Sequence, residues 1–99
     1  MARRIRLTPR ARSDLGQIWA YIAHDNIAAA ERLLERINEV FQLLVEHPEA
    51  GRKRDEIAQG LRSFAIRTHV VFYEIREGSV DVIRVLDGHR DIAEGMFDE

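Results

Sequence analysis

The sequence predicts an α+β domain in which an antiparallel helical hairpin packs on an antiparallel sheet. Two segments between residues 9 and 47 repeat apolar residues at three- and four-residue steps, which is typical of amphipathic helices. Three later segments, rich in Val, Ile, Phe and Tyr, are separated by short turns, which indicates an antiparallel meander. The 99 residues suffice for one domain. We therefore expect residues 1–99 to form a single unit in the order β-α-α-β-β-β.

A short strand and the first helix begin this unit. Residues 4–7 alternate polar and apolar side chains, as a half-buried strand does. Thr8 is expected to cap the helix, and Pro9 suits the first helical position because its missing N–H costs nothing there. The apolar face of this helix consists of Ala11, Leu15, Ile18, Trp19 and Ile22. We expect Trp19 to lie in the core, with an interface anchor as the alternative.

The second helix follows after a break at residues 24–26, where Asn26 ends the interruption and a new N-cap is expected. Its apolar face consists of Ala30, Leu33, Leu34, Ile37, Val40, Phe41, Leu44 and Val45. The helix is expected to end at His47, since a residue before proline avoids the helical region. The link between the helices is so short that they must lie antiparallel.

Residues 48–60 are polar and bounded by helix breakers, so we expect a loop. The strands of the meander are expected at residues 61–66, 69–76 and 80–86. A sheet needs one covered face and the helical hairpin has one apolar face to bury, so the two should pack together. The pattern leaves open where the first strand joins the sheet.

Composition excludes several classes of function. The chain has no cysteine, which removes disulfides, thiolate nucleophiles and cysteine-based zinc sites. No apolar run approaches the length of a membrane span, and we expect a cytoplasmic protein. The net charge is −2, so specific DNA binding by this chain alone is not expected. The basic residues are nonetheless unusual, since fourteen arginines accompany the single lysine, Lys53.

Two groups of residues are candidates for chemistry. His89 lies in the polar segment Asp87-Gly88-His89-Arg90-Asp91, which either orients a phosphate and accepts a proton or is a turn with self-paired charges. Four arginines recur across the meander: Arg62, Arg67, Arg76 and Arg84. Unpaired, they would bind an anionic ligand; paired with Glu74 and Asp81, they would form an ordinary solvated face. No histidines have the spacing of metal ligands, and no glycine-rich phosphate loop is present, so neither a metal nor a cofactor is expected.

Five segments, in order, resemble the ParE branch of the ParE/RelE toxin superfamily. The basic first strand leads through Thr8-Pro9 into a helix with Ala11, Asp14, Leu15, Ile18, Trp19, Tyr21 and Ile22. His47-Pro48-x-x-Gly51, Gly60-Leu61-Arg62, His69-Val70-Val71-Phe72-Tyr73 and Ile83-Arg84-Val85-Leu86 follow. The resemblance covers nearly the whole chain.

The resemblance implies the toxin of a type II toxin–antitoxin pair, neutralised by a ParD-like antitoxin and inhibiting DNA gyrase by binding, without chemistry of its own. The alternatives are a RelE-like, ribosome-dependent mRNA endoribonuclease that needs no metal, and a degenerate toxin that retains only antitoxin binding. The residues that we assign to the target are Arg62, Arg67, Arg84, His89 and Arg90. Those assigned to the antitoxin are Trp19, Ile22, Leu33 and Ile37.

One departure from the family pattern bears on the choice of target. Asp87 stands where the family often has a histidine, and a carboxylate there would repel a phosphate. A nuclease would have to rely on Arg62, Arg84, His89 and Arg90, with a base for the 2′-hydroxyl and arginines for the phosphate. The departure therefore favours gyrase inhibition over RNA cleavage.

Overall fold

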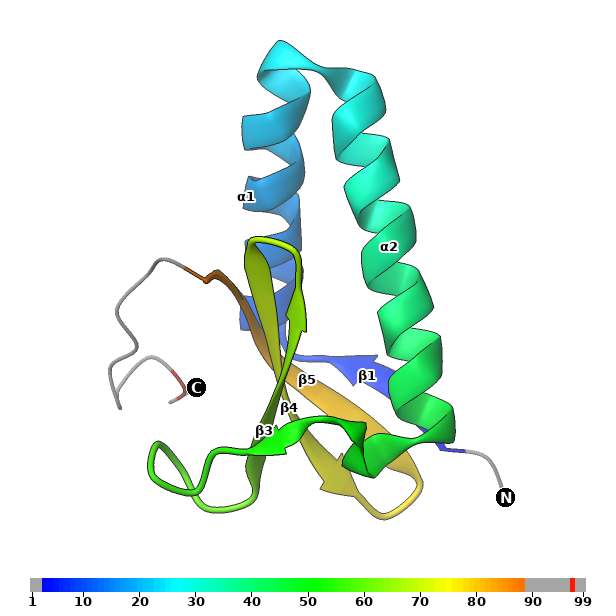
Figure 1. The fold of residues 1–99 in the computed structure, drawn as a ribbon, viewed down its shortest axis with the longest axis vertical. Helices are drawn as coiled ribbons and strands as arrows, with labels where there is room; N and C mark the ends of the chain where they lie inside the picture. Colours follow the sequence, from blue (N-terminus) through cyan, green and yellow to red (C-terminus); the bar gives the residue numbers. More distant parts are fainter. Residues whose placement is uncertain (1–2, 89–96, 98–99) are drawn as a thin grey trace.

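Two antiparallel helices pack on one face of a five-stranded sheet in the computed structural model, which describes residues 3–88 and residue 97 (Figure 1). The elements are β1 (Arg4–Leu7), α1 (Pro9–Asp25), α2 (Ile27–Glu46), the 3₁₀ turn η1 (Pro48–Ala50), β2 (Arg52–Lys53), β3 (Leu61–Ile66), β4 (His69–Arg76) and β5 (Ser79–Asp87). This arrangement confirms the predicted α+β class, the helical hairpin and the meander.

Both helices begin at the expected caps. The Thr8 hydroxyl accepts a hydrogen bond from the backbone N–H of Ala11 at 3.1 Å, and Pro9 occupies the first turn of α1. The side chain of Asn26 accepts from the N–H of Ala29 at 3.0 Å. Asn26 has an extended backbone and ends α1 as well as starting α2, so one residue reverses the chain between the helices.

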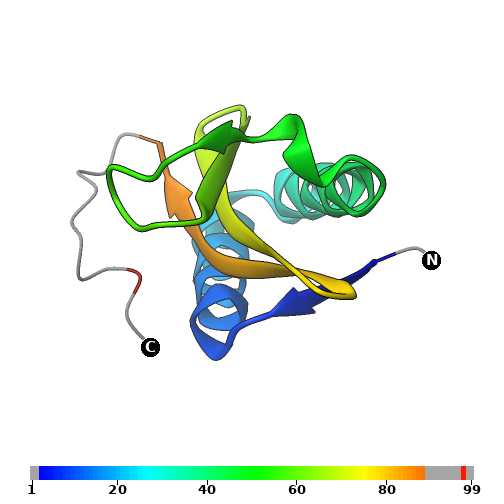
Figure 2. The same cartoon turned by 90° about the horizontal axis from the view of Figure 1, so that it is seen from below.

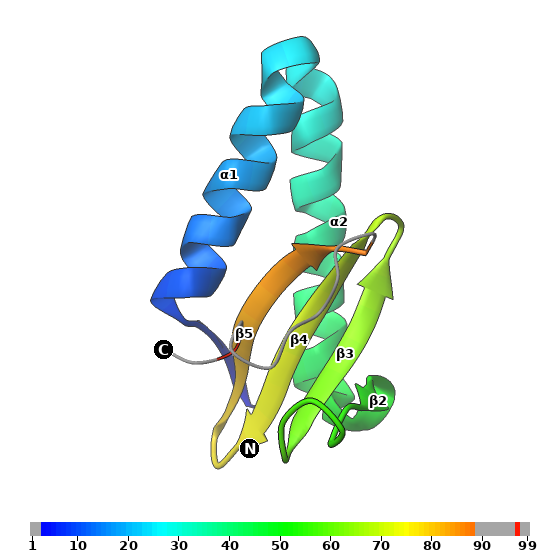
Figure 3. The same cartoon turned by 90° about the vertical axis from the view of Figure 1, so that its left-hand side faces the viewer.

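The sheet is mixed, which corrects the expectation of a purely antiparallel one. The strand order is β1-β5-β4-β3-β2, and β1 runs parallel to β5, with Arg4 opposite Ser79 and Leu7 opposite Val82. Figure 3 shows β5, β4 and β3 side by side. All other neighbours are antiparallel. The direction of β1 is set by pairing with residues about seventy-five positions later, and no local pattern encodes that pairing.

The predicted loop 48–60 contains a strand that its sequence does not reveal. Arg52 and Lys53 form β2 by pairing with Ser63 and Arg62 at the edge of β3. Both residues of β2 are exposed, so no alternation of apolar side chains marks them. This strand exists because β3 offers an unpaired edge.

The sheet buries apolar residues on both faces. The larger cluster lies under the helices and includes Ile37, Leu44, Val71, Tyr73 and Val82. The smaller cluster, on the opposite face, comprises Leu61, Phe72, Ile83 and Leu86, with Ile57, Ala58, Val70 and Phe97 packed against it. Figure 2, from below, shows α2 and the 54–60 loop on opposite sides of β3 and β4.

Candidate functional site

A buried ion pair fixes α1 against β5. The guanidinium of Arg84 donates two hydrogen bonds to the carboxylate of Asp14, from Nε at 2.8 Å and from Nη2 at 2.9 Å. Arg84 is only 9% exposed, and its pKa is raised because it donates these hydrogen bonds to Asp14. The carboxylate also accepts from the backbone N–H of Val85 at 3.0 Å. Asp14 therefore satisfies both a buried cation and a strand N–H that has no strand partner on that side.

The contacts of α1 protect the second half of the β5 edge. β1 pairs with β5 only as far as Val82, and a register shift near Phe72 follows in the β4–β5 ladder. Beyond this point Thr8 donates its hydroxyl proton to the carbonyl of Ile83 at 2.9 Å. The start of α1 thus takes the place of a neighbouring strand along this stretch of β5.

A second buried network joins the end of α2 to the sheet. The Tyr73 hydroxyl donates to the carbonyl of Pro48 at 2.6 Å and accepts from the N–H of Gly51 at 2.8 Å. Tyr73 is fully buried, and burial raises the pKa of its hydroxyl. A Cβ at position 51 would overlap the hydroxyl and ring of Tyr73, so glycine is needed there for space. The backbone of Gly51 is ordinary extended backbone.

Arg62 belongs to the same region. Its Nη1 donates to the carbonyls of Gly51 at 2.8 Å and Glu49 at 3.4 Å. The guanidinium therefore closes the turn after α2 onto β3.

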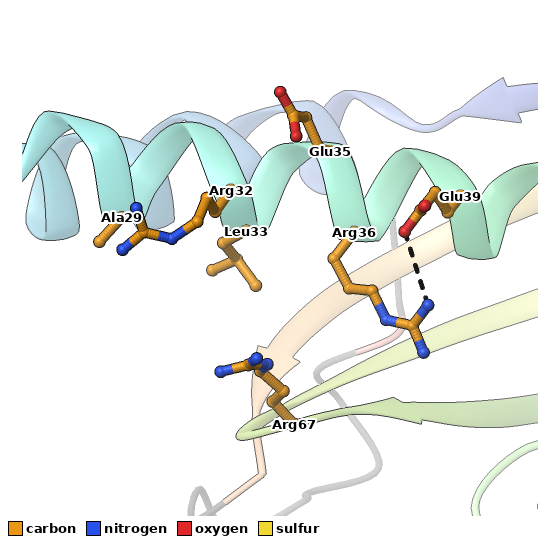
Figure 4. A pocket seen from close by; sticks show the side chains of 7 residues that line it. All are labelled: Ala29, Arg32, Leu33, Glu35, Arg36, Glu39 and Arg67. Atoms are coloured by element: carbon orange, nitrogen blue, oxygen red, sulfur yellow. Dashed lines mark ion pairs between the residues drawn. The ribbon is translucent and has the colours of Figure 1, made fainter.

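Two hollows border the turn between β3 and β4, one lined by residues of α1 and the other by residues of α2. The α1–β5 groove, of about 620 Å³, lies on the α1 side. Its lining is Asp14, Gln17, Ile18, Tyr21, Ile22, Thr68, His69, Val85, Leu86 and Asp87. The arginine pocket, of about 400 Å³, lies on the α2 side and is lined by Ala29, Arg32, Leu33, Glu35, Arg36, Glu39 and Arg67 (Figure 4).

The residues assigned to the antitoxin are divided among these features. Ile22 lines the α1–β5 groove and Leu33 lines the arginine pocket. Trp19 is 37% exposed, so it is not the core residue that its helical position suggests. Ile37 is 1% exposed within the core under the helices. We therefore leave Ile37 out of any proposed surface.

The arginines assigned to the target do not gather at one place. Arg62 lies near the start of β3 and Arg67 in the turn just after its end, roughly 16 Å apart at about 3.3 Å per residue. Arg62 holds loop carbonyls and Arg84 holds Asp14. Arg76, the fourth arginine of the meander, pairs with Glu74. Pairing with Glu74 was one of the two alternatives that the sequence left open. His89 and Arg90 lie outside the described residues.

Sequence reasoning missed the roles of Asp14, Gly51 and Tyr73, although all three stand in the motifs quoted above. Asp14 had a signal, since it is an acid among the apolar positions of α1, at a step of three from Ala11. A carboxylate on a buried helical face requires a partner. The sequence could not say that the partner lies seventy residues away.

Within residues 3–88 and 97, no three His, Asp or Glu side chains are placed to hold a metal ion. No helix in this same part of the chain has the length and apolar character needed to cross a membrane.

Comparison with known proteins matches the chain to one family. The family described as "ParE toxin of type II toxin-antitoxin system, parDE" matches residues 5–92. Toxin ParE3 of Caulobacter vibrioides is 33% identical over 94 residues, covering 94% of this chain and 93% of that protein. Toxin ParE1 of the same organism is 33% identical over 82 residues, covering 82% and 84%.

Solved structures share the fold. A chromosomal ParDE toxin–antitoxin system from P. aeruginosa superposes with a TM-score of 0.72 at 19% identity, covering 87% of this chain and 96% of that one. The toxin–antitoxin complex RelBE2 from Mycobacterium tuberculosis gives 0.62 at 26% identity, covering 88% and 99%. With the family match spanning most of the sequence, the chain belongs to the ParE toxins of type II toxin–antitoxin systems.

Proposed function

We propose that this toxin inhibits DNA gyrase by binding it and that a ParD-like antitoxin neutralises it. The observation that carries the proposal is the 33% identity to Toxin ParE3 along nearly the full length of both chains. The fold resemblance to a ParDE system supports the choice of antitoxin.

The hydrogen bonds that Arg62 and Arg84 make within the fold support binding over catalysis. A nuclease of the RelE type would need arginines at the scissile phosphate, and Arg62 and Arg84 are the described candidates. The guanidinium of Arg84 is buried against Asp14, and that of Arg62 donates to backbone carbonyls. Moving either one to a phosphate would break these hydrogen bonds and leave polar groups unsatisfied.

The α1–β5 groove supports the antitoxin part of the proposal. It combines apolar side chains, Ile18, Ile22 and Leu86 among them, with a polar rim that includes His69 and Asp87. Tyr21 stands at this groove with 82% of its surface exposed. An amphipathic segment of another chain would cover these apolar groups and bond to the rim.

RNA cleavage is the second candidate, because the chain also shares its fold with the RelBE2 complex. Since Arg62 and Arg84 are engaged, such a reaction would depend on His89 and Arg90. Replacing both by Ala would then abolish toxicity while the protein still folds.

The test is to induce the chain alone in a bacterial host and follow DNA and protein synthesis by pulse labelling. We expect DNA synthesis to fall first while translation continues. In parallel, the purified chain should inhibit supercoiling by purified gyrase.

An early loss of translation, relieved by H89A/R90A, would instead establish the nuclease. If folded protein accumulates and neither synthesis falls, the chain is a degenerate toxin that only binds its antitoxin. Untouched gyrase at a large excess of toxin would overturn the proposed target.

A further inference from the structure

Three guanidinium groups from two distant segments line the arginine pocket. Arg32 and Arg36 project from successive turns of α2, and Arg67 projects toward them from the β3–β4 turn (Figure 4). Leu33 lies between the helix arginines and faces the same hollow. The pocket therefore places three guanidinium groups around the apolar side chain of Leu33.

The backbone at Arg67 is a second, independent observation. Arg67 has φ = 52°, the left-handed region, and it is the one described non-glycine residue with a positive φ. A side chain with a Cβ is disfavoured there, and glycine or asparagine would fit at lower cost. The turn thus carries local strain at the residue that extends its guanidinium toward α2.

The charges of the pocket are incompletely balanced. Arg36 is 3.5 Å from Glu39 in an exposed pair of the kind that contributes little. Arg32 and Arg67 have no ion-pair partner among residues 3–88 and 97. Two guanidinium groups are therefore available to an incoming anion.

The surroundings favour a carboxylate on a peptide over a nucleic-acid backbone. Glu35 and Glu39 line the same pocket, and the whole chain has a net charge of −2, so a densely charged chain of phosphates would be repelled more strongly than a peptide whose carboxylates alternate with apolar side chains. A single carboxylate fits the planar fork of an arginine and accepts two hydrogen bonds from it. A neighbouring apolar side chain of the same peptide would contact Leu33.

We propose that the arginine pocket binds an acidic segment of the antitoxin, with Arg67 and Arg32 as the principal contacts of its carboxylates. The inference rests on the proposed function for the identity of the partner. The α1–β5 groove borders the same turn, where Thr68 and His69 line it. One partner crossing the turn would place apolar side chains in the groove and carboxylates in the pocket. It would also cover Arg67, which we assign to the target, and so block target binding.

The experiment measures binding of the full chain to a fluorescent peptide of alternating glutamate and leucine, by fluorescence anisotropy at low salt. The matched probe replaces each glutamate by glutamine. We expect the acidic peptide to bind about tenfold more tightly than the neutral one, because charge-assisted hydrogen bonds are lost with the carboxylates. Its affinity should fall as salt is raised.

Variants identify the pocket. Arg67→Asn suits the left-handed backbone, so the melting temperature should stay level or rise while the affinity falls about threefold to tenfold. Arg32→Gln should weaken binding similarly. Arg52→Gln, at an exposed arginine of β2 away from the pocket, is the matched control and should bind as the native chain does.

Several results would overturn the proposal: no binding of the acidic peptide, equal binding of the glutamine peptide, or equal losses for Arg67→Asn and Arg52→Gln. Displacement of the peptide by inorganic phosphate or single-stranded DNA, at concentrations below that of the peptide, would assign the pocket to phosphate instead. The assay uses neither gyrase nor cells. A chain that inhibits gyrase but ignores the acidic peptide would contradict the pocket alone, and the reverse result would contradict the proposed target alone.

Discussion

The Tyr73 hydroxyl connects three parts of the chain through two hydrogen bonds. It donates to the carbonyl of Pro48, the first residue of η1, and accepts from the N–H of Gly51 just before β2, while its ring lies in the core under the helices. Arg62 adds a bond to the carbonyl of Gly51 from β3. The turn after α2 is therefore held by side chains of the sheet, because its own three-residue 3₁₀ turn has no side-chain cap.

Replacing Tyr73 by Phe should lower the free energy of unfolding by about 1–3 kcal/mol. The ring remains, but a buried N–H and a carbonyl lose their partner. Urea denaturation measures the change. Tyr21→Phe is the matched control, since that hydroxyl is on a side chain with 82% exposure, and it should change stability by less than about 0.5 kcal/mol.

The stability difference between the native chain and Tyr73→Phe should depend on pH. Burial raises the pKa of Tyr73 in the folded chain above its unfolded value of about 10. The folded state then holds more protons in this range, so the free energy of unfolding falls as the pH rises above about 10. Tyr73→Phe lacks this contribution, and the difference between the two proteins should shrink with rising pH. A constant difference would contradict the role assigned to the hydroxyl.

At the scale of elements, the Asp14–Arg84 pair decides how α1 meets the sheet. Helix α1 contacts β5 after β1 has ended, and the polar groups of that edge are bonded by Thr8 and Asp14. A buried ion pair adds little net stability compared with apolar packing, but removal of one partner leaves a buried charge uncompensated. The pair thus favours the one position of α1 on the sheet in which both charges are compensated, because any other position leaves a buried charge without a partner.

Asp14→Ala should cost about 3–5 kcal/mol of unfolding free energy, because Arg84 stays buried without its anion. Asp14→Asn should cost less, since its side-chain oxygen can still accept from the N–H of Val85. The double variant Asp14→Ala/Arg84→Met should be more stable than Asp14→Ala alone. Chemical denaturation of these three proteins, of Arg84→Met and of the native chain measures this series. If the losses of Asp14→Ala and Arg84→Met add up to that of the double variant, the pair is not coupled.

At the scale of the whole molecule, both outer edges of the sheet are short and basic. The outermost strands are β1, of four residues, and β2, of two. Arg4 and Arg6 are exposed on β1, as Arg52 and Lys53 are on β2. Short edge strands with positive charges resist pairing with another copy of the chain. This gives the cationic first strand a physical role apart from any target.

The double variant Arg4→Val/Arg6→Val should therefore self-associate. Light scattering after size exclusion should show an apparent mass that rises with concentration, while the native chain stays at one mass under the same conditions. Arg10→Gln/Arg12→Gln removes two charges from the exposed face of α1 and controls for net charge. Equal behaviour of the two double variants would refute edge protection by the β1 arginines.

The sequence by itself determined the class of fold, the ends of the helices and the strands of the meander. Those features depend on interactions within a few residues: the hydroxyl of Thr8 on the first turn of α1, the Asn26 cap of α2, and alternation along β4. The family also followed from the sequence, because its motifs are ordered along the chain.

Only the tertiary structure decided the direction of β1, the existence of β2 and the partners of Asp14 and Tyr73. Each depends on residues far apart in the sequence, such as Asp14 and Arg84 or Gly51 and Tyr73, and no periodicity encodes such pairs. The candidate site in the structure differs from the one that the sequence suggested, again because of contacts between distant residues. The sequence marked Arg62, Arg67 and Arg84 as one set of cations, but burial and hydrogen bonding engage Arg62 and Arg84 within the fold and leave Arg67 facing α2.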